Sequence, residues 1–394
     1  MRVAVTRWSV LLLCMLALGG CSTIKGWFEI DDDEDPRQPV ELEKFEQTVK
    51  AKRLWSTGVG DGQGDGLYRI EPVIGDGRIY AASADGEVKA LDVTNGKRVW
   101  DADLELPISG GVGLYENSLF LGASDGFVIR LDASNGDLVW RAAVTGEVLA
   151  PPQGNGKVVV AQTYDGKLHG LDFATGERLW TYDSNMPVLT IRGTSTPILQ
   201  GNRVIAGFSN GRVVGFEAAT GAVEWEARVA IPQGRSEIER IVDVDGSMAL
   251  LGNELFASSY QGFVVSIDIN TGRKLWERPV SSVSGVSQGF GNVYASDEDG
   301  TVIAFLRTGQ GQRWTQDALG WRGLGRPVPV SSYLAVADFE GYVHLLSQVD
   351  GSFVGRFRPD SDGVRADMLS DGNVLYVFGN SGDLQAYELS STSR

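Results

Sequence analysis

The stretch Gly86–Trp100, GEVKALDVTNGKRVW, shows how the rest of this 394-residue chain is organised. It opens with a glycine after an acidic residue, continues as an apolar strand and ends on a tryptophan after Asn95-Gly96. The interval of fourteen residues from glycine to tryptophan recurs along the chain. It runs from Gly86 to Trp100, Gly126 to Trp140, Gly166 to Trp180, Gly211 to Trp225, Gly262 to Trp276 and Gly300 to Trp314. A chain that repeats itself about every 40 residues is typical of a repeat architecture.

Each repeat contains the turn and strand signals of four short strands. In the first repeat, Asp85-Gly86 supplies a tight hairpin turn between two apolar runs, a pair that suits a type I′ turn. Equivalent turn pairs follow along the chain. They are Asp85-Gly86, Asp125-Gly126, Asp165-Gly166, Asn210-Gly211, Gln261-Gly262, Asp299-Gly300, Glu340-Gly341 and Ser381-Gly382. These eight turns predict an all-β chain, an eight-bladed β-propeller of four-stranded antiparallel blades.

Two of the predicted blades lack the tryptophan. Fourteen residues after Gly341 stands Gly355, and the chain ends before the same distance from Gly382. The missing piece lies upstream, because Arg53-Leu54-Trp55 copies Arg178-Leu179-Trp180. We therefore expect residues 52–57 to form the outer strand of the last blade and to close the ring. The structural repeat positions are then Trp55, Trp100, Trp140, Trp180, Trp225, Trp276 and Trp314.

The composition excludes several classes of function. A formal net charge of −16 argues against nucleic-acid binding, because little would neutralise phosphates. Cys14 and Cys21 are the only cysteines, which excludes a disulfide scaffold and a cysteine-based zinc site. His169 and His344 are the only histidines, and each stands three residues after a turn glycine. Such equivalent positions in distant repeats predict strand surface rather than a paired metal site.

Residues 1–20 have the pattern of a secretory signal peptide. A basic start precedes the short apolar run Val10–Leu18. The ending Leu18-Gly19-Gly20-Cys21 resembles a bacterial lipobox, in which the cysteine becomes the lipid-modified first residue. The resemblance implies acylation of Cys21, palmitate included, and Ser22 implies sorting to the outer membrane. Ordinary cleavage that leaves Cys21 unmodified is the alternative.

Residues 21–50 are expected to form an acidic tether, and residues 51–394 the propeller. The block Asp31–Asp35, DDDED, repels itself and favours an extended chain. Within the tether, Leu42 to Val49 is expected to form a short helix.

The lengths of the connections between blades identify candidate binding loops. Most connections from a repeat tryptophan to the next inner strand are short, such as the 12 residues from Trp100 to Val112 and the 10 from Trp276 to Val286. The stretches from Trp55 to Pro72 and from Trp180 to Pro197 take 17 residues, and that from Trp225 to Met248 takes 23. All run from an outer to an inner strand, so all should lie on one face of the ring. Insertions on one face of a repeat fold often mark the binding face.

The last two insertions join neighbouring blades and mix aliphatic with charged residues. They contain Leu189-Thr190-Ile191-Arg192 and Ile241-Val242-Asp243-Val244-Asp245. The pattern leaves two interpretations open. Either the loops form a protein-binding patch with apolar anchors and a charged surround, or their aliphatic residues cap the core.

Signals of catalytic chemistry are weak. Asp61–Gly66, DGQGDG, imitates the start of an EF-hand calcium loop, but its twelfth position is Pro72 and the nearest glutamate, Glu71, is eleventh. We therefore interpret it as a glycine-rich loop. The chain contains no G-x-S-x-G motif, no phosphate-binding glycine loop and no Cys/His cluster. We expect no catalytic residues, no metal ligands and no cofactor.

The repeat, with its Leu-Asp, Thr-Gly and tryptophan, resembles the tryptophan-docking repeat of quinoprotein dehydrogenases. Those enzymes hold the cofactor PQQ beside adjacent cysteines and a calcium site, whereas the mature chain here has no cysteine pair. A PQQ-dependent dehydrogenase-like periplasmic quinoprotein is therefore the alternative function.

A second resemblance covers nearly the whole chain. The lipobox, the acidic tether, Leu54-Trp55-Ser56 with Val59-Gly60-Asp61-Gly62, the repeats and the insertions are similar to the BamB-type outer-membrane lipoproteins of the β-barrel assembly machinery. The resemblance implies a non-enzymatic scaffold, lipid-anchored on the periplasmic face of the outer membrane, that binds the periplasmic POTRA region of BamA. It further implies a complex with other assembly-machinery lipoproteins, and contact with unfolded outer-membrane protein clients is a bolder hypothesis.

The contact motifs of that family match both insertions. Leu189-Thr190-Ile191-Arg192 is similar to its Leu-x-Leu-Arg, with isoleucine in place of the second leucine, and Asp243-Val244-Asp245 matches its Asp-Val-Asp. The resemblance implies that Leu189 and Ile191 are apolar anchors. It also implies that Arg192, Asp243 and Asp245 give directional charged contacts to the partner.

Overall fold

A computed structural model describes residues 37–392. The predicted signal peptide, Cys21 and most of the tether lie outside the described residues. The chain divides into two compact units, Met1–Pro39 and Val40–Arg394. Of the first unit, residues 37–39 are described, and they contain no helix or strand. The second unit contains all of the strands.

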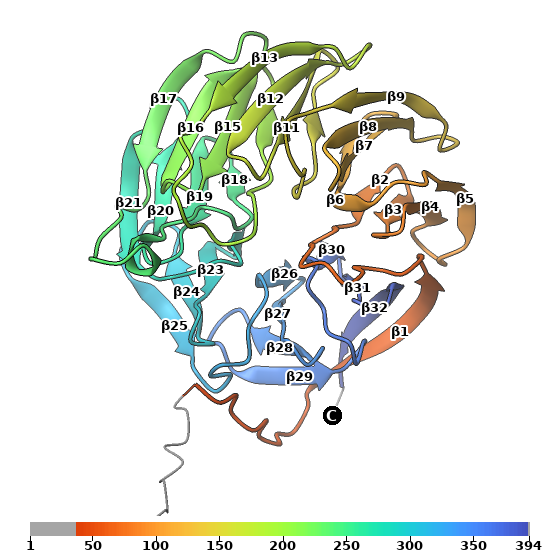
Figure 1. Cartoon of the computed structure of the whole chain (residues 1–394). Helices are drawn as coiled ribbons and strands as arrows, with labels where there is room; N and C mark the ends of the chain where they lie inside the picture. The colour runs from red at the N-terminus through yellow and green to blue at the C-terminus, as the bar shows by residue number, and fades with distance from the viewer. Residues whose placement is uncertain (1–36, 393–394) are drawn as a thin grey trace, which may run out of the picture. The chain divides into compact units, whose positions relative to one another are not determined.

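The second unit is a ring of eight four-stranded antiparallel sheets (Figure 1). We number these blades in chain order, starting with the blade that contains β2. Blades 1 to 4 consist of β2 (Val73–Gly75), β3 (Arg78–Ala82), β4 (Glu87–Asp92) and β5 (Arg98–Asp103); β6 (Ile108–Tyr115), β7 (Ser118–Ala123), β8 (Phe127–Asp132) and β9 (Leu138–Ala143); β10 (Gln153–Gly154), β11 (Val158–Gln162), β12 (Lys167–Asp172) and β13 (Arg178–Asp183); β14 (Ile198–Gln200), β15 (Arg203–Phe208), β16 (Arg212–Glu217) and β17 (Val223–Arg228).

The second half of the ring repeats the pattern, except that its last blade takes its outer strand from the other end of the chain. Blades 5 to 8 consist of β18 (Ala249–Leu251), β19 (Glu254–Ser258), β20 (Phe263–Asp268) and β21 (Lys274–Pro279); β22 (Val286–Gly289), β23 (Asn292–Ser296), β24 (Val302–Leu306) and β25 (Gln312–Gln316); β26 (Val328–Val330), β27 (Tyr333–Ala337), β28 (Val343–Ser347) and β29 (Phe353–Phe357); β30 (Leu369–Asp371), β31 (Val374–Phe378), β32 (Asp383–Ser391) and β1 (Val49–Gly58).

The predicted eight-bladed propeller and its closure are both confirmed. The N-terminal strand β1 pairs antiparallel with β32, so that Trp55 lies opposite Ala386. The strand is longer than the predicted 52–57, and the expected boundary between tether and propeller at residue 50 falls inside it.

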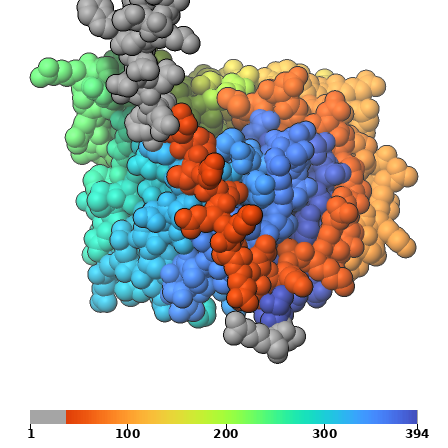
Figure 2. All heavy atoms as spheres, turned by 90° about the horizontal axis from the view of Figure 1, so that it is seen from below, coloured from red at the N-terminus to blue at the C-terminus, as the bar shows by residue number. Residues whose placement is uncertain are grey.

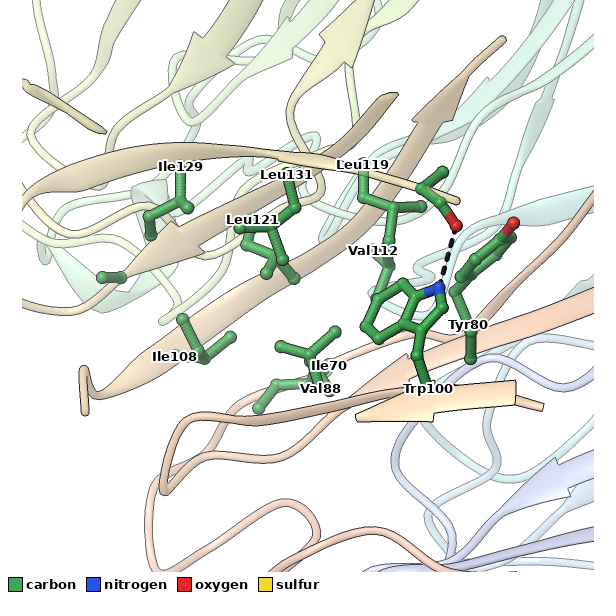
Figure 3. Close-up of a cluster of buried hydrophobic side chains, with 14 residues drawn as sticks. Ile70, Tyr80, Val88, Trp100, Ile108, Val112, Leu119, Leu121, Ile129 and Leu131 are labelled. Atoms are coloured by element: carbon green, nitrogen blue, oxygen red, sulfur yellow. Dashed lines mark hydrogen bonds between the residues drawn. The ribbon is translucent and has the colours of Figure 1, made fainter. Parts of the chain in front are cut away.

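Burial explains why the strands differ in composition. The middle strands of each blade are covered by neighbouring blades on both sides, and β7, SLFLGA, is buried at every position. The outer strands are covered on one side, and in β5, RVWDAD, Trp100 is the buried residue. This pattern places the hydrophobic core between the blades, as Figure 3 shows for blades 1 and 2.

Each repeat tryptophan joins its blade to the next one. The indole Nε1–H of Trp100 donates to the backbone carbonyl of Ala133 at 3.0 Å (Figure 3). The ring lies against Gly136, where a Cβ would come within 2.7 Å of it. The same bond is donated by the other repeat tryptophans. Their acceptors are Val93 for Trp55, Phe173 for Trp140, Ala218 for Trp180, Ile269 for Trp225, Arg307 for Trp276 and Gln348 for Trp314.

The junction of blades 7 and 8 has no such tryptophan. Its equivalent, Gly355, leaves room for β1, because a Cβ there would come within 2.9 Å of the Val49 carbonyl oxygen. Val49 is buried between the two blades. The residues before β1 continue over blade 7, where the Thr48 N–H donates to the Val354 carbonyl at 2.9 Å. We call residues 40–48 the strap, and in Figure 2 the red N-terminal segment runs over the blue side of the propeller.

The short helix predicted for Leu42 to Val49 is wrong, because residues 40–48 form neither helix nor strand and β1 begins at Val49. Its backbone groups are satisfied by distant partners instead of by helical bonds. Arg322 Nη1 donates to the Val40 carbonyl at 3.0 Å, and Arg356 Nη1 donates to the Glu43 carbonyl at 2.8 Å.

The 3-10 helix η1 (Ile238–Arg240) is the helical element within residues 37–392. Over that same range, no helix has the length and apolar character needed to span a membrane.

Candidate partner-binding surface

Two loops on one face of the ring carry the predicted contact residues. Loop 3–4, residues 184–197, joins β13 to β14, and loop 4–5, residues 229–248, joins β17 to β18. The loops touch, because the backbone N–H of Ile191 donates to Oδ2 of Asp243. The Cβ of Asp245 would also lie 3.3 Å from a Cβ placed on Gly193. The two insertions found by counting therefore form one continuous surface.

The apolar residues of these loops divide between surface and core. Leu189 is 44% exposed and its neighbour Val188 is 85% exposed, whereas Val242 is buried. Ile191 and Ile241 are half-buried. Val242 therefore caps the core, as one interpretation expected. Leu189 does not, because its side chain is exposed.

Arg192 is held in place by contacts within the chain. Its guanidinium forms an ion pair with Glu147 at 2.8 Å, and both side chains are about one-third exposed, at 32%. The guanidinium carbon also lies 5.8 Å from the ring centroid of Tyr68 and 5.5 Å from that of Tyr164. Such contacts between a cation and aromatic rings limit the rotamers of the arginine. Contacts within the chain thus fix the orientation of Arg192.

Asp243 faces the chain's own backbone. It is buried, its Oδ2 accepts the Ile191 N–H, and its Oδ1 is buried without a hydrogen-bond partner among the described residues. Burial raises the pKa of Asp243 to about 7, although the hydrogen bond from Ile191 opposes this rise. In the free chain, Asp243 therefore orients the segment that contains Ile191 and Arg192.

Asp245 is more exposed as a residue, but its Oδ2 is buried and has no hydrogen-bond partner within residues 37–392. Burial and the nearby charge of Asp243 raise the pKa of Asp245 well above its ordinary value, while Arg69 and Ser209 oppose the rise. Desolvation disfavours the charged form of a carboxyl group. The contact with Ser209 does not outweigh the burial of the carboxyl group, so Asp245 favours its protonated form.

A pocket of about 80 Å³ lies beside the two loops. It is lined by residues that precede the inner strands of several blades, among them Leu67, Glu71, Leu149, Ile191, Asp245 and Val283. The inner strands surround the axis of the ring (Figure 1), and the pocket is lined by the connections that lead into them. We call it the axial pocket.

The axial pocket contains residues that the sequence analysis missed or used differently. Glu71, considered there only as the end of a calcium loop, has its pKa raised to about 8 by burial and by Asp367, against the charges of Arg326 and Arg69. Tyr68 and Glu147, which contact Arg192, belong to no recognisable sequence motif. Spacing along the chain gave no signal for them, because they come from other inter-blade connections. The glycine-rich loop is closed by Gln63, whose side-chain amide donates to the Ile70 carbonyl at 2.9 Å.

The two histidines are buried, so the prediction that they lie on a strand surface is wrong. His169 lies near the hydroxyls of Thr145, Thr163 and Thr181, and burial lowers its pKa to about 4. His344 lies in blade 7 beside Asp338. The histidines belong to different blades and do not form a paired site. Among residues 37–392, no three His, Cys, Asp or Glu side chains are grouped so that they could hold a metal ion.

Comparisons with known proteins identify a family model and relatives that match this chain. The model of the family described as outer membrane protein assembly factor BamB matches residues 84–316. The protein of that name from Pseudomonas aeruginosa is 47% identical over 97% of this chain and 98% of its own length. The one from Marinobacter adhaerens is 40% identical over 96% of this chain and 95% of its own length.

Solved structures place the fold among propellers of two kinds. The crystal structure of BamB from Moraxella catarrhalis matches with a TM-score of 0.78 and 28% identity, over 86% of this chain and all of that one, 100%. A quinohemoprotein alcohol dehydrogenase from Comamonas testosteroni matches with a TM-score of 0.68 but 15% identity, over 88% of this chain and 77% of that one, so it shares the fold alone. Family model, full-length relatives and structural match agree that this chain belongs to the family of outer membrane protein assembly factor BamB.

Proposed function

We propose that this chain is a non-enzymatic, lipid-anchored scaffold of the machinery that assembles outer-membrane β-barrel proteins, and that it binds the periplasmic POTRA region of BamA. Membership of the BamB family supports the assembly role, because the relatives carry the name of an outer membrane protein assembly factor. In this proposal the protein belongs to the complex that contains the other assembly-machinery lipoproteins and assists the insertion of outer-membrane proteins.

The observation that carries the binding site is the hydrogen bond between loops 3–4 and 4–5. Asp243 fixes the backbone of Ile191, and the same segment leaves Leu189 exposed and Arg192 held between two tyrosines. An exposed apolar anchor beside a preoriented arginine is the composition expected of an interface centre. Leu189, Ile191 and Arg192 would contact the partner, while Asp243 orients them and Asp245 stands beside the axial pocket.

Charge reversal of Arg192 tests this site. We expect Arg192→Glu to reduce strongly the amount of BamA that is co-purified from detergent-solubilised membranes, because it removes the contact and places a carboxylate beside Glu147. A matched control is Arg178→Glu on the exposed side of β13. Both variants should melt close to the wild-type temperature. Equal recovery of BamA with both variants would remove the loops from the proposed interface.

The anchoring part of the proposal concerns residues outside those described. Residues 1–20 would be removed as a signal peptide, Cys21 would carry acyl chains that include palmitate, and Ser22 would direct the protein to the periplasmic face of the outer membrane. Mass spectrometry of the purified N-terminal peptide should find acylated Cys21, and Cys21→Ser should release the protein into the soluble periplasmic fraction. An unmodified Cys21 in the mature protein would contradict the anchor.

The enzymatic alternative has a direct test. If the chain were a quinoprotein, addition of PQQ and calcium would produce a new absorption band and reduction of an artificial electron acceptor. We expect neither, because the cysteine pair of the quinoprotein resemblance is missing and the described residues offer no grouped metal ligands. For unfolded outer-membrane clients, the matching prediction is that a photo-crosslinker placed on an outer strand captures them during assembly.

A further inference from the structure

The axial pocket contains the carboxyl groups of Asp245 and Glu71. Ser209 forms a hydrogen bond with Asp245, but Oδ2 of Asp245 is buried and has no partner within residues 37–392. Buried polar atoms in folded proteins are nearly always satisfied, so each exception needs an explanation. Oδ2 of Asp245 is such an exception, and it lines a pocket that also contains the half-buried Glu71, so the pocket points to a missing donor.

The neighbouring carboxylate of Asp367, in contrast, receives hydrogen bonds from the chain itself. Asp367 accepts a hydrogen bond from Arg326 at 2.9 Å and another from the hydroxyl of Ser247 at 2.8 Å through one oxygen. Ser247 also lines the axial pocket, two residues after Asp245. The chain therefore supplies two donors to one oxygen of Asp367 and leaves Oδ2 of Asp245 without one.

We infer that the axial pocket receives the ammonium group of a lysine side chain from the bound partner. The inference rests on the proposed partner-binding function and deepens it, because Ile191 and Arg192 line both the proposed interface and the pocket. An ammonium group has three donors and no acceptor, which complements two carboxylates. The apolar walls, Leu67, Leu149 and Val283, suit the methylene stem of a lysine.

Other occupants fit the pocket less well. A metal ion needs more converging ligands, and the described residues do not group three His, Cys, Asp or Glu side chains for that purpose. An arginine prefers a planar pair of acceptors, whereas these two carboxylates come from different blades, before β2 and before β18. The volume of about 80 Å³ matches the end of one side chain or a few water molecules.

Arg69 is the chain's own competing cation. It lines the same pocket, and its charge lowers the pKa of both Glu71 and Asp245. It is exposed, and it donates no hydrogen bond to either carboxylate within the described residues. The other groups that face these carboxyls are Asp367 and Arg326 for Glu71, and Asp243 and Ser209 for Asp245.

Binding of an ammonium group at this site is linked to protons. In the free protein both carboxyls have a raised pKa, about 8 for Glu71, so they hold protons near neutral pH. A cation favours the ionised form and lowers that pKa, which releases protons on binding. The complex should therefore become tighter as the pH rises from 6 to about 8, the free pKa of Glu71.

Calorimetric titration of the full chain in detergent with the BamA POTRA region measures this linkage. For the wild-type chain we expect tighter binding at pH 8 than at pH 6, and proton release at pH 7 in buffers of different ionisation enthalpy. Asp245→Asn should bind roughly 30-fold more weakly at pH 8, the scale for truncating one member of a buried charged pair. The double variant Glu71→Gln with Asp245→Asn should show much less proton release and a weaker pH dependence, since Asp243, with a pKa of about 7, is the remaining group. Wild-type affinity with an unchanged pH profile in that double variant would overturn the inference.

Chemical modification of the partner identifies the cation. Acetylation of the lysines of the POTRA region removes their charge and leaves its arginines intact. Acetylation should weaken binding to the wild-type chain much more than binding to Asp245→Asn. An equal loss for both chains, or no loss, would contradict a lysine in the pocket.

Two further variants separate the possible failures. Arg69→Gln should bind the POTRA region at least as tightly as the wild type. Loss of the pH dependence in this variant would show that Arg69, and not a lysine of the partner, is the cation that interacts with the carboxylates. If Arg192→Glu binds normally, the proposed docking face is wrong. If Arg192→Glu fails to bind while Asp245→Asn behaves as the wild type, the docking face stands and only the lysine site falls.

Discussion

Buried carboxyl groups at two places on the ring differ in how well their hydrogen-bonding capacity is satisfied. In blade 7, Asp338 accepts hydrogen bonds from Arg322 at 2.7 Å and from His344 at 3.0 Å through the same oxygen. At loops 3–4 and 4–5, the docking loops, Oδ2 of Asp245 is buried and has no hydrogen-bond partner within residues 37–392. A satisfied buried network contributes to one rigid arrangement, whereas unsatisfied acceptors reduce stability until a donor arrives. The first region supports closure of the ring, and the second is consistent with the proposed binding of a partner.

The network in blade 7 extends to the strap. Arg322 also donates to the Val40 carbonyl. Arg356 donates one hydrogen bond to Nδ1 of His344 and another to the Glu43 carbonyl. Burial disfavours ionisation of Asp338, but the hydrogen bonds from His344 and Arg322 outweigh it and hold its pKa below the ordinary value. The network thus reinforces the junction where the repeat tryptophan is replaced by Gly355.

The largest effect is expected at the strand that closes the ring. Trp55→Ala should reduce the free energy of unfolding by roughly 3–5 kcal/mol, because it opens a cavity between blades 8 and 1 and weakens β1. Trp276→Ala is the matched control, since Trp276 has the same repeat position but is less buried. Urea denaturation measures both. A loss for Trp55→Ala no greater than that for Trp276→Ala would show that closure does not depend on this strand.

Isosteric removal of one carboxylate from each region should have effects of opposite sign. Asp338→Asn should cost about 2–3 kcal/mol, because Arg322 and His344 lose a charged acceptor in a buried site. Asp245→Asn should raise the free energy of unfolding by on the order of 1 kcal/mol, because it removes a buried acidic group whose Oδ2 has no hydrogen-bond partner. Thermal melts of both variants test this, and destabilisation of equal size by both would remove the distinction between the regions.

The pH dependence of stability should separate the regions as well. Glu71 and Asp243 have a raised pKa in the folded chain, about 8 and about 7, so the folded state binds more protons than the unfolded one below these values. Stability therefore increases as the pH falls from 8 to about 6.5. Burial lowers the pKa of His344 below 6.5, so protonation of the unfolded chain begins to offset this gain below that pH.

Urea titrations between pH 8 and pH 5.5 measure this profile. The rise between pH 8 and pH 6.5 should become smaller in the double variant Glu71→Gln with Asp243→Asn. A rise of the same size in that variant would show that other groups cause it.

The smallest effect is expected in the strap. The ring of Phe45 stacks on Phe353 with centroids 5.4 Å apart, and the Arg356 guanidinium carbon lies 5.0 Å from the centroid of Phe45. Phe45→Ala should therefore cost about 1 kcal/mol. The exposed neighbour Lys44 provides the control, and Lys44→Ala should leave the melting temperature unchanged. If both variants melt as the wild type, the strap does not contribute to closure.

Much of the fold could be predicted because its signals are local. A tight turn needs a glycine such as Gly86, whose φ is 105°, and every docked tryptophan needs a glycine of the next blade below its ring. Both requirements repeat at fixed spacing, so counting gave the number of blades and the strand that closes the last one. The strap was mispredicted because its partners, such as Arg322, lie in a distant part of the chain.

The chemistry of the site could be predicted only in part. Spacing identified the two long loops, and resemblance pointed to Leu189, Ile191 and Arg192 within them. That Asp243 is buried and bonds to Ile191 depends on how loops of different blades pack, which no local pattern encodes. The environment of Glu71 arises in the same way, because the residues that face it belong to other blades.

Hydrogen–deuterium exchange on the full chain, with and without the BamA POTRA region, tests most directly whether the docking loops receive the partner. The account predicts that the partner slows exchange at backbone amides of residues 186–193 and 240–246, and leaves the strap and β1 unchanged. Slower exchange confined to the outer strands or to the opposite face of the ring, with both loops unaffected, would contradict it.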